Sequence, residues 1–141
     1  MKHPFNRKSP CFVLLDDDLF ALTMTEKIIR RCCRRSEIRT FSTPKEAMEY
    51  MGARDFAEKD RDTVFMTDLH MPETDGFEVL DRMGSTFKKM GGRVNIFVIS
   101  SAACPEEIKR VFSYEYVIGF IDKPFSDFKM KQIMDCIQYP L

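Results

Sequence analysis

Five short apolar runs, spaced by roughly 25 residues, restrict the possible folds more than any other feature of the sequence. The runs are Phe12–Leu15, Ile38–Phe41, Val64–Met66, Ile96–Ile99 and Ile118–Ile121. Most are continuously apolar rather than alternating, which is typical of strands covered on both faces of a parallel sheet. The spacing leaves room for a crossover helix after each strand.

The segments between these runs show helical periodicity, with apolar residues three or four positions apart. The expected buried stripes are Phe20/Met24/Ile28/Cys32, Pro44/Ala47/Met48/Met51, Phe77/Leu80/Gly84/Phe87, Ile108/Val111/Phe112 and Met130/Ile133/Met134/Ile137. Helix-start signals agree with them, because Thr43 to Glu46 matches a capping box, and Pro105 and Ser126 occupy typical first positions. Strict alternation of strands and helices predicts a doubly wound α/β fold with a parallel sheet.

Length and charge narrow the functional classes. A chain of 141 residues is expected to form one domain. Its formal net charge of zero argues against direct nucleic-acid binding, which normally needs a basic surface. No apolar run is long enough to span a bilayer, and the first residues lack the apolar segment of a secretory signal. We therefore expect a cytoplasmic protein with no membrane contact.

The five cysteines do not suggest a disulfide framework or a zinc site. Their number is odd, no CxxC motif occurs, and His3 and His70 are isolated in the sequence. We expect reduced and mostly buried thiols that pack as small apolar groups.

Polar residues follow four of the five apolar runs directly. Asp16, Asp17 and Asp18 follow the first, Asp68 comes two residues after the third, Ser100 follows the fourth, and Asp122 and Lys123 follow the fifth. Ligands of open parallel α/β sheets bind at the carboxyl ends of the strands, so these side chains are expected to converge there. The second run ends without an acid, which fits an outer strand.

Three carboxylates close together would repel one another unless a cation is present. Asp16, Asp17 and Asp68 therefore predict a site for a hard divalent ion, with Mg²⁺ favoured by a few oxygen ligands and several waters. Lys123 and the Ser100 hydroxyl could then contact phosphoryl oxygens, which makes a phosphoryl acceptor plausible. Asp18 is better explained as the cap of the next helix.

Four segments together resemble a known family. They read FVLLDDD from Phe12, VFMTDLHMPETDG from Val64, IFVISSA from Ile96 and GFIDKPF from Gly119. In this order and spacing they resemble the receiver domains of two-component response regulators, over roughly residues 9–139. The resemblance implies a (βα)5 flavodoxin-like, CheY-like fold with strand order 2-1-3-4-5 and helices on both faces.

The resemblance also implies roles for individual residues. Asp68 matches the aspartate that accepts a phosphoryl group from a phosphohistidine, and Ser100 and Lys123 match the two residues that contact this group. Asp16 and Asp17 match the metal-binding pair, which shares Mg²⁺ with Asp68 and the backbone carbonyl at the position of His70. Phe120 matches the aromatic switch residue, and Pro124 follows a peptide bond that is cis in the family.

Three positions depart from the commonest pattern of the family. Phe120 stands where tyrosine is frequent and lacks a hydroxyl that could bond to Ser100, so the switch is expected to be coupled differently. His70 and Ala102 flank the path of an incoming water, where an imidazole would alter the dephosphorylation rate.

The function implied by the resemblance is that of a signalling domain rather than an enzyme. We expect a sensor histidine kinase or a histidine phosphotransfer protein as the phosphoryl donor. Phosphorylation would switch the surface of the fourth helix, fifth strand and fifth helix for a downstream protein, with the domain assisting its own dephosphorylation. The chain is expected to act as a monomer or a phosphorylation-dependent dimer, with residues 1–8 as an extension and no effector domain.

Other functions remain open at this stage. A degenerate receiver would bind partners without phosphorylation. A small Mg²⁺-dependent aspartyl-phosphate phosphatase of the haloacid-dehalogenase type usually has a second aspartate where this chain has His70. A flavodoxin-like redox module would need a phosphate-binding loop after the first strand, where Asp16 to Asp18 would repel a phosphate.

Overall fold

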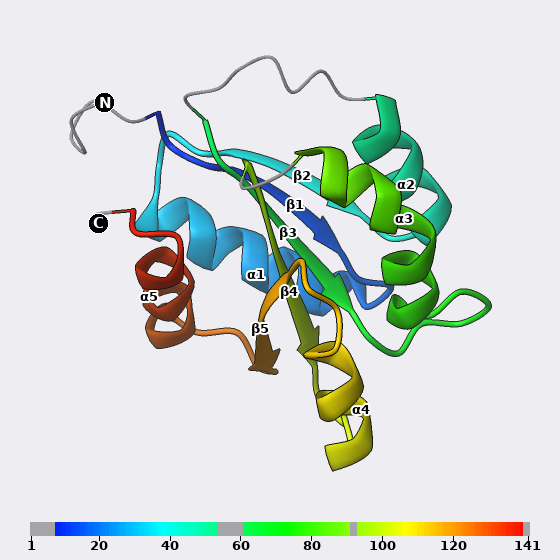
Figure 1. Cartoon of the computed structure of the whole chain (residues 1–141). Helices are drawn as coiled ribbons and strands as arrows, with labels where there is room; N and C mark the ends of the chain where they lie inside the picture. The colour runs from blue at the N-terminus through cyan, green and yellow to red at the C-terminus, as the bar shows by residue number, and fades with distance from the viewer. Residues whose placement is uncertain (1–7, 54–60, 91–92, 140–141) are drawn as a thin grey trace.

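The computed structural model describes residues 8–53, 61–90 and 93–139 (Figure 1). Within these residues the strands are β1 (Cys11–Leu15), β2 (Glu37–Phe41), β3 (Thr63–Asp68), β4 (Val94–Ser100) and β5 (Val117–Asp122). They form a parallel sheet with the order β2-β1-β3-β4-β5. The predicted fold class is confirmed, and so is the outer position of β2. Of the expected extension, residues 1–8, only Lys8 lies within the described residues.

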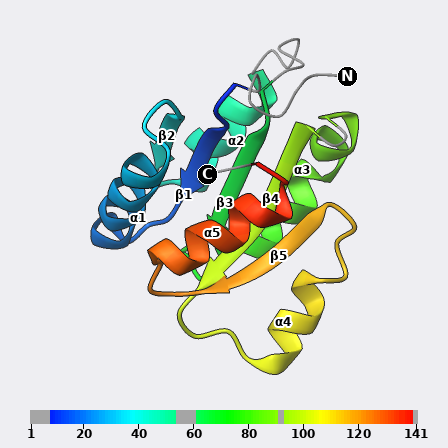
Figure 2. The ribbon, with the colours of Figure 1, turned by 90° about the vertical axis from the view of Figure 1, so that its left-hand side faces the viewer.

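Helices cover both faces of the sheet. They are α1 (Leu19–Cys32), α2 (Pro44–Ala53), α3 (Gly76–Met90), α4 (Pro105–Val111) and α5 (Asp127–Cys136). Alternate residues of β1 point to opposite sides. Val13 belongs to the core shared with α2, α3 and α4, whereas Phe12 belongs to the core shared with α1 and α5. Figure 2 shows α1 and α5 in front of the sheet and α2 and α3 behind it.

Of the three interior strands, β1 and β3 are the most buried. Every residue of β1 and β3 is buried, whereas β2 and β5 each have exposed or half-buried positions. This difference follows from position, because a central strand has neighbours on both sides and helices on both faces. The acids at the ends of β1 and β3 are therefore held by the most enclosed backbone.

The stripe expected to be buried on α1 is wrong in its first half. Phe20 is 76% exposed and Met24 is 41% exposed, whereas the buried face is formed by Leu22, Thr25, Ile28 and Ile29. A helix has 3.6 residues per turn, so residues spaced strictly by four drift by about 40° at each step. Phe20 and Cys32, three such steps apart, cannot share one face.

The expected stripe on α4 is also mostly wrong. Val111 is buried, but Ile108 is only half-buried and Phe112 is 54% exposed. The helix lies beside the outer strand β5 and contacts little of the sheet (Figure 2), so only one of its side chains is buried.

None of the five cysteines forms a disulfide bond, but the prediction that most of their thiols are buried is wrong. Cys11 and Cys33 are buried, Cys32 is half-buried, and Cys104 and Cys136 are exposed. The two exposed thiols lie at helix ends, at the N-cap of α4 and the last residue of α5, where the chain meets solvent.

The helix starts follow the local signals in the sequence. The Asp18 carboxylate accepts hydrogen bonds from the amides of Phe20 and Ala21, and the Ser126 hydroxyl accepts one from the amide of Lys129. These caps satisfy amides that have no partner within the helix. None of the helices in the described part of the chain is long and apolar enough to cross a membrane.

Candidate functional site

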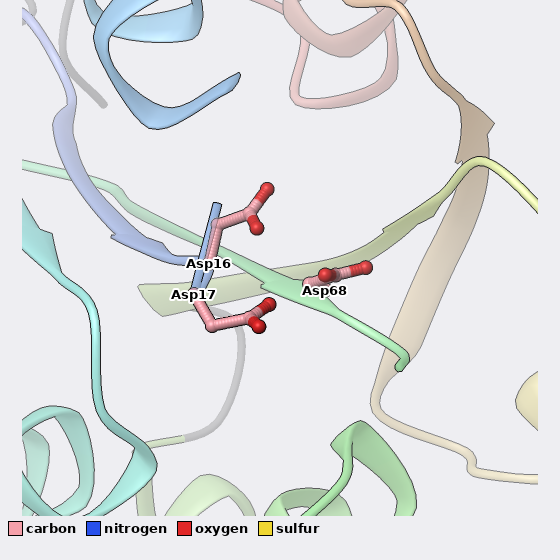
Figure 3. Close-up of side chains that lie close together, drawn as sticks. All are labelled: Asp16, Asp17 and Asp68. Atoms are coloured by element: carbon pink, nitrogen blue, oxygen red, sulfur yellow. The ribbon is translucent and has the colours of Figure 1, made fainter. Parts of the chain in front are cut away.

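Three carboxylates meet at the carboxyl ends of β1 and β3. Asp68 is the last residue of β3, and Asp16 directly follows Leu15, which pairs with Thr67 in the sheet. One oxygen from each of Asp16, Asp17 and Asp68 lies within 4.8 Å of the others (Figure 3). The strand register thus brings together acids that are about 50 residues apart in the chain.

Backbone amides orient the two buried carboxylates. The amide of Leu69 donates to Asp68 Oδ1 at 2.8 Å, and the amide of Asp18 donates to Asp16 Oδ1 at 2.9 Å. Each bond uses one oxygen of its carboxylate. The second oxygen, Oδ2 in both residues, faces Lys123, which directly follows β5.

Lys123 contacts both buried carboxylates. Its Nζ lies 2.7 Å from Asp16 Oδ2 and 3.4 Å from Asp68 Oδ2. The amide of Lys123 donates to the carbonyl of Ser100, and the peptide bond between Lys123 and Pro124 is cis. Burial lowers the pKa of the Lys123 ammonium, but the hydrogen bond to Asp16 and the two negative charges outweigh burial, so the pKa is raised. The lysine is therefore a stable cation of the site.

The electrostatics of Asp68 differ from those of an ordinary surface acid. Burial, followed by repulsion from Asp16, raises the pKa of the Asp68 carboxyl to about 6, against the opposing attraction of Lys123. Its side chain is 7% exposed. The surrounding protein groups therefore do not fully stabilise the charged form of Asp68, and an additional cation would stabilise it.

The donor set fits a hard divalent cation. It consists of carboxylate oxygens only, and Asp17 is exposed while its two partners are buried, so one side of the cluster is open to water. Mg²⁺ is commonly held by one or two carboxylates together with waters and substrate phosphates. Asp16, Asp17 and Asp68 would hold such an ion. The predicted contribution of the His70 carbonyl stays a prediction.

Ser100 and His70 lie beside the acidic cluster and contact each other. Ser100, the last residue of β4, is 1% exposed, and its Oγ lies 3.5 Å from His70 Nδ1 and accepts from the amide of Ala102 at 3.4 Å. The structure therefore brings Ser100 to the expected edge of the sheet. Its described hydrogen-bond partners do not include Asp68.

Phe120 does not join the acidic group. It lies within β5, is half-buried, and packs against the core shared with α3 and α4. Its role as a switch residue stays a prediction.

Sequence reasoning did not identify Glu107 as a neighbour of the site. Its Oε2 lies 2.8 Å from His70 Nε2, and its Oε1 accepts from the amide of Cys104 at 3.1 Å. The hydrogen bond to His70, followed by that to Cys104, lowers the pKa of the Glu107 carboxyl. The sequence predicts a helix start at Pro105, but nothing in it indicates that the third helical residue reaches across to His70.

The arrangement is suited to phosphoryl transfer. The buried Asp68 carboxylate can act as a nucleophile, and the Lys123 ammonium can neutralise charge on a phosphoryl group beside it. Reactions of phosphoryl groups depend mostly on positioning and charge stabilisation, which these fixed groups supply. Fold and site together define the class: a parallel α/β domain with three carboxylates and a lysine at the carboxyl edge of its sheet.

The chain belongs to the response regulator receiver domain family, whose model matches residues 12–135. It is therefore a receiver domain of two-component signalling. No sequence among curated proteins matches it significantly.

Solved structures share the fold at low sequence identity. A two-component response regulator from Cytophaga hutchinsonii has a TM-score of 0.82 and 21% identity, with 95% of this chain and 100% of that chain covered. A receiver protein from Dyadobacter fermentans has a TM-score of 0.79 and 23% identity, with 92% and 98% covered. The chemotaxis response regulator CheY4 of Vibrio cholerae has a TM-score of 0.70 and 20% identity, with 92% and 98% covered.

Proposed function

We propose that this receiver accepts a phosphoryl group on Asp68 in a Mg²⁺-dependent reaction. The observation that carries the proposal is the position of Asp68 Oδ2, which lies 3.4 Å from Lys123 Nζ within a cluster of three carboxylates. This position supports a role of Oδ2 as the nucleophile, because a lysine ammonium and a candidate metal site both lie next to it. Membership of the receiver family supports the same chemistry.

The proposed donor is a phosphohistidine on a sensor histidine kinase or a histidine phosphotransfer protein. An Asp68 oxygen attacks phosphorus, forming a P–O bond, while the P–N bond to the donor imidazole breaks and its electron pair returns to the nitrogen. Bound Mg²⁺ would neutralise charge on the transferring group. The Leu69 amide holds Oδ1 of Asp68, which leaves Oδ2 beside Lys123 available for attack.

Each flanking side chain has a proposed task in this reaction. Lys123 stabilises the charge that develops on phosphoryl oxygens, and its contact with Asp16 keeps the ammonium in place. Asp16 and Asp17 hold the metal ion. Ser100, which is 1% exposed, donates its hydroxyl to the phosphoryl group after turning away from His70.

The phosphorylated domain is proposed to signal through the surface formed by α4, β5 and α5. Movement of Ser100 would open space for Phe120, whose half-buried ring lies on the adjacent strand. The change is a shift between two populations, biased by the charge and acceptor oxygens of the phosphoryl group. We further propose that residues 9–139 form the whole receiver and that it acts in the cytoplasm.

The test is phosphorylation by acetyl phosphate, followed by intact mass with and without Mg²⁺. We expect the mass of one phosphoryl group to be added only with Mg²⁺, and the adduct to be labile in base and absent in Asp68→Asn. A Lys123→Ala variant should fold and gain the adduct much more slowly. A folded wild-type chain that binds Mg²⁺ but gains no phosphoryl group from acetyl phosphate or from a phosphorylated kinase would refute the proposal.

A further inference from the structure

Helix α4 is thinly packed against the rest of the molecule. It has seven residues, of which only Val111 is buried. Figure 2 shows the helix beyond β5, at the edge of the sheet. One buried valine contributes only ~2 kcal/mol of hydrophobic stabilisation. Polar and aromatic contacts therefore have a large share in setting the position of α4.

At its C-terminal end, α4 is fixed to α3 through one carboxylate. The Tyr114 hydroxyl donates to Asp81 Oδ1 at 2.7 Å, and Arg110 Nη2 lies 3.8 Å from Asp81 Oδ2. The Arg110 guanidinium also lies 4.0 Å from the centre of the Phe77 ring, which belongs to α3. We call the contacts of Asp81 with Arg110 and Tyr114 the Asp81 clamp.

The segment after α4 is also fixed to α3. The Tyr116 hydroxyl donates to the carbonyl of Leu80, and its ring lies 5.3 Å from Phe87 and 5.7 Å from Tyr114, measured between centroids. Burial raises the pKa of Tyr116 to about 12, so this hydroxyl remains a donor at neutral pH. The connection between α4 and β5 is thus anchored on one neighbouring helix.

At its N-terminal end, α4 is tied to the loop that follows Asp68. Glu107 contacts His70 at 2.8 Å, and His70 in turn faces Ser100. Both ends of α4 are therefore held by the segment 70–81, which directly follows the proposed phosphoacceptor. This segment therefore connects the residues that follow Asp68 with both ends of α4.

We propose that Asp81 is a positioning residue that holds α4 in its unphosphorylated arrangement and thereby opposes phosphorylation of Asp68. This inference rests on the proposed function. The proposal requires the clamp contacts to be weaker in the phosphorylated arrangement, so that removing them destabilises the unphosphorylated arrangement relative to it. By linkage, a chain without the clamp accepts a phosphoryl group more readily, and phosphorylation loosens the clamp by the same factor.

The experiment compares Asp81→Ala and Tyr114→Phe with the matched control Glu78→Ala. Glu78 lies on the same helix and contacts Arg82 at 3.3 Å, one turn away, rather than the Asp81 clamp. Amide hydrogen exchange of the unphosphorylated chain measures directly how strongly the clamp stabilises α4 against local opening. Exchange should rise about threefold to tenfold in peptides covering 105–116 of the clamp variants, the range for one lost hydrogen bond, and stay unchanged in β1 and β3.

The second measurement is the ratio of phosphorylated to free chain at steady state in acetyl phosphate and Mg²⁺, with the dephosphorylation rate of each variant measured separately after the acetyl phosphate is removed. The ratio of phosphorylated to free chain should rise by the same threefold to tenfold in Asp81→Ala, less in Tyr114→Phe, and remain at the wild-type value in Glu78→Ala. A purely structural role would lower the melting temperature without moving this ratio.

The outcomes separate the two proposals. If hydrogen exchange in α4 is unchanged in Asp81→Ala, the Asp81 clamp does not hold the helix in position, even if the wild type is phosphorylated normally. Faster exchange with a wild-type phosphorylation ratio overturns the coupling to Asp68. A wild-type chain that accepts no phosphoryl group refutes the proposed function, and the role assigned to Asp81 falls with it.

Discussion

Replacing Asp68 by asparagine should stabilise the metal-free protein at neutral and alkaline pH. The pKa of this carboxyl rises from 3.8 to about 6 in the folded chain, because burial and Asp16 disfavour its charge. Two pKa units correspond to ~3 kcal/mol at 1.36 kcal/mol per unit. Asparagine keeps an oxygen for the Leu69 amide, and Lys123 keeps its 2.7 Å contact with Asp16. We expect a gain of about 2–3 kcal/mol at pH 8.

The gain has a defined pH dependence. Between pH 3.8 and about 6 the folded chain holds the Asp68 proton more tightly than the unfolded chain does. The folded state therefore binds more protons there, and the contribution of Asp68 to stability falls as pH rises through this window. The difference in unfolding free energy between Asp68→Asn and wild type should be small near pH 4, grow through pH 5–6, and level off above pH 7.

Urea unfolding in EDTA, followed by far-UV circular dichroism, measures this difference at each pH, since the chain has no tryptophan for fluorescence. Asp135→Asn, at an exposed position of α5, controls for the removal of one negative charge. A difference that is the same at pH 4 and pH 8, or a variant less stable than wild type at pH 8, would refute the electrostatic account of the site.

Three further predictions follow from single contacts. Mg²⁺ at a hundred times its Kd should stabilise the wild type by about 2.7 kcal/mol in thermal unfolding, and Asp17→Asn should remove most of this gain; an equal gain in both chains would exclude Asp17 as a ligand. Gly76→Ala would place Cβ 2.5 Å from the Asp68 carbonyl oxygen and 2.9 Å from Leu69 Cα, and should cost about 2 kcal/mol or more in urea unfolding; a wild-type midpoint would contradict the close approach. Asp18→Ala should cost about 1 kcal/mol by the same measurement, whereas an unchanged stability would show that the cap is dispensable.

Local sequence patterns predict the elements of this fold well because each strand and helix carries its own signal. The apolar runs identify all five strands, and Ser126 and Asp18 cap the helices that they precede. These patterns do not indicate how far each face of a strand or helix is buried by neighbouring elements. Ile118 reads as part of a buried run but is 41% exposed, because β5 is an edge strand with little helix over it.

The same limit explains the exposed start of α1. Phe20 is apolar and helical, yet it is largely exposed, and this exposure follows from the tertiary arrangement rather than from periodicity. Met24 lies beside it, and both side chains line an apolar pocket of about 350 Å³ together with Pro124 and Phe125. Spacing alone cannot distinguish such a pocket from the core.

The site was predictable to the extent that strand ends define it. Asp16 and Asp68 were expected to meet because parallel strands end at one edge, and the structure places Lys123 between them. Contacts made by long side chains across the edge were not predictable. Glu107 reaches from α4 to His70 in the loop after β3, and only the folded arrangement of α4 brings the two together.

The order of the strands along the chain has a consequence for synthesis. The carboxylates of Asp16 and Asp68 belong to the first half of the chain, whereas their cation, Lys123, follows the last strand. A chain emerging from the ribosome therefore carries the acids long before it carries the lysine. Under the proposed function, the acceptor site is complete only when β5 has docked, so phosphorylation would report completed folding as well as an incoming signal.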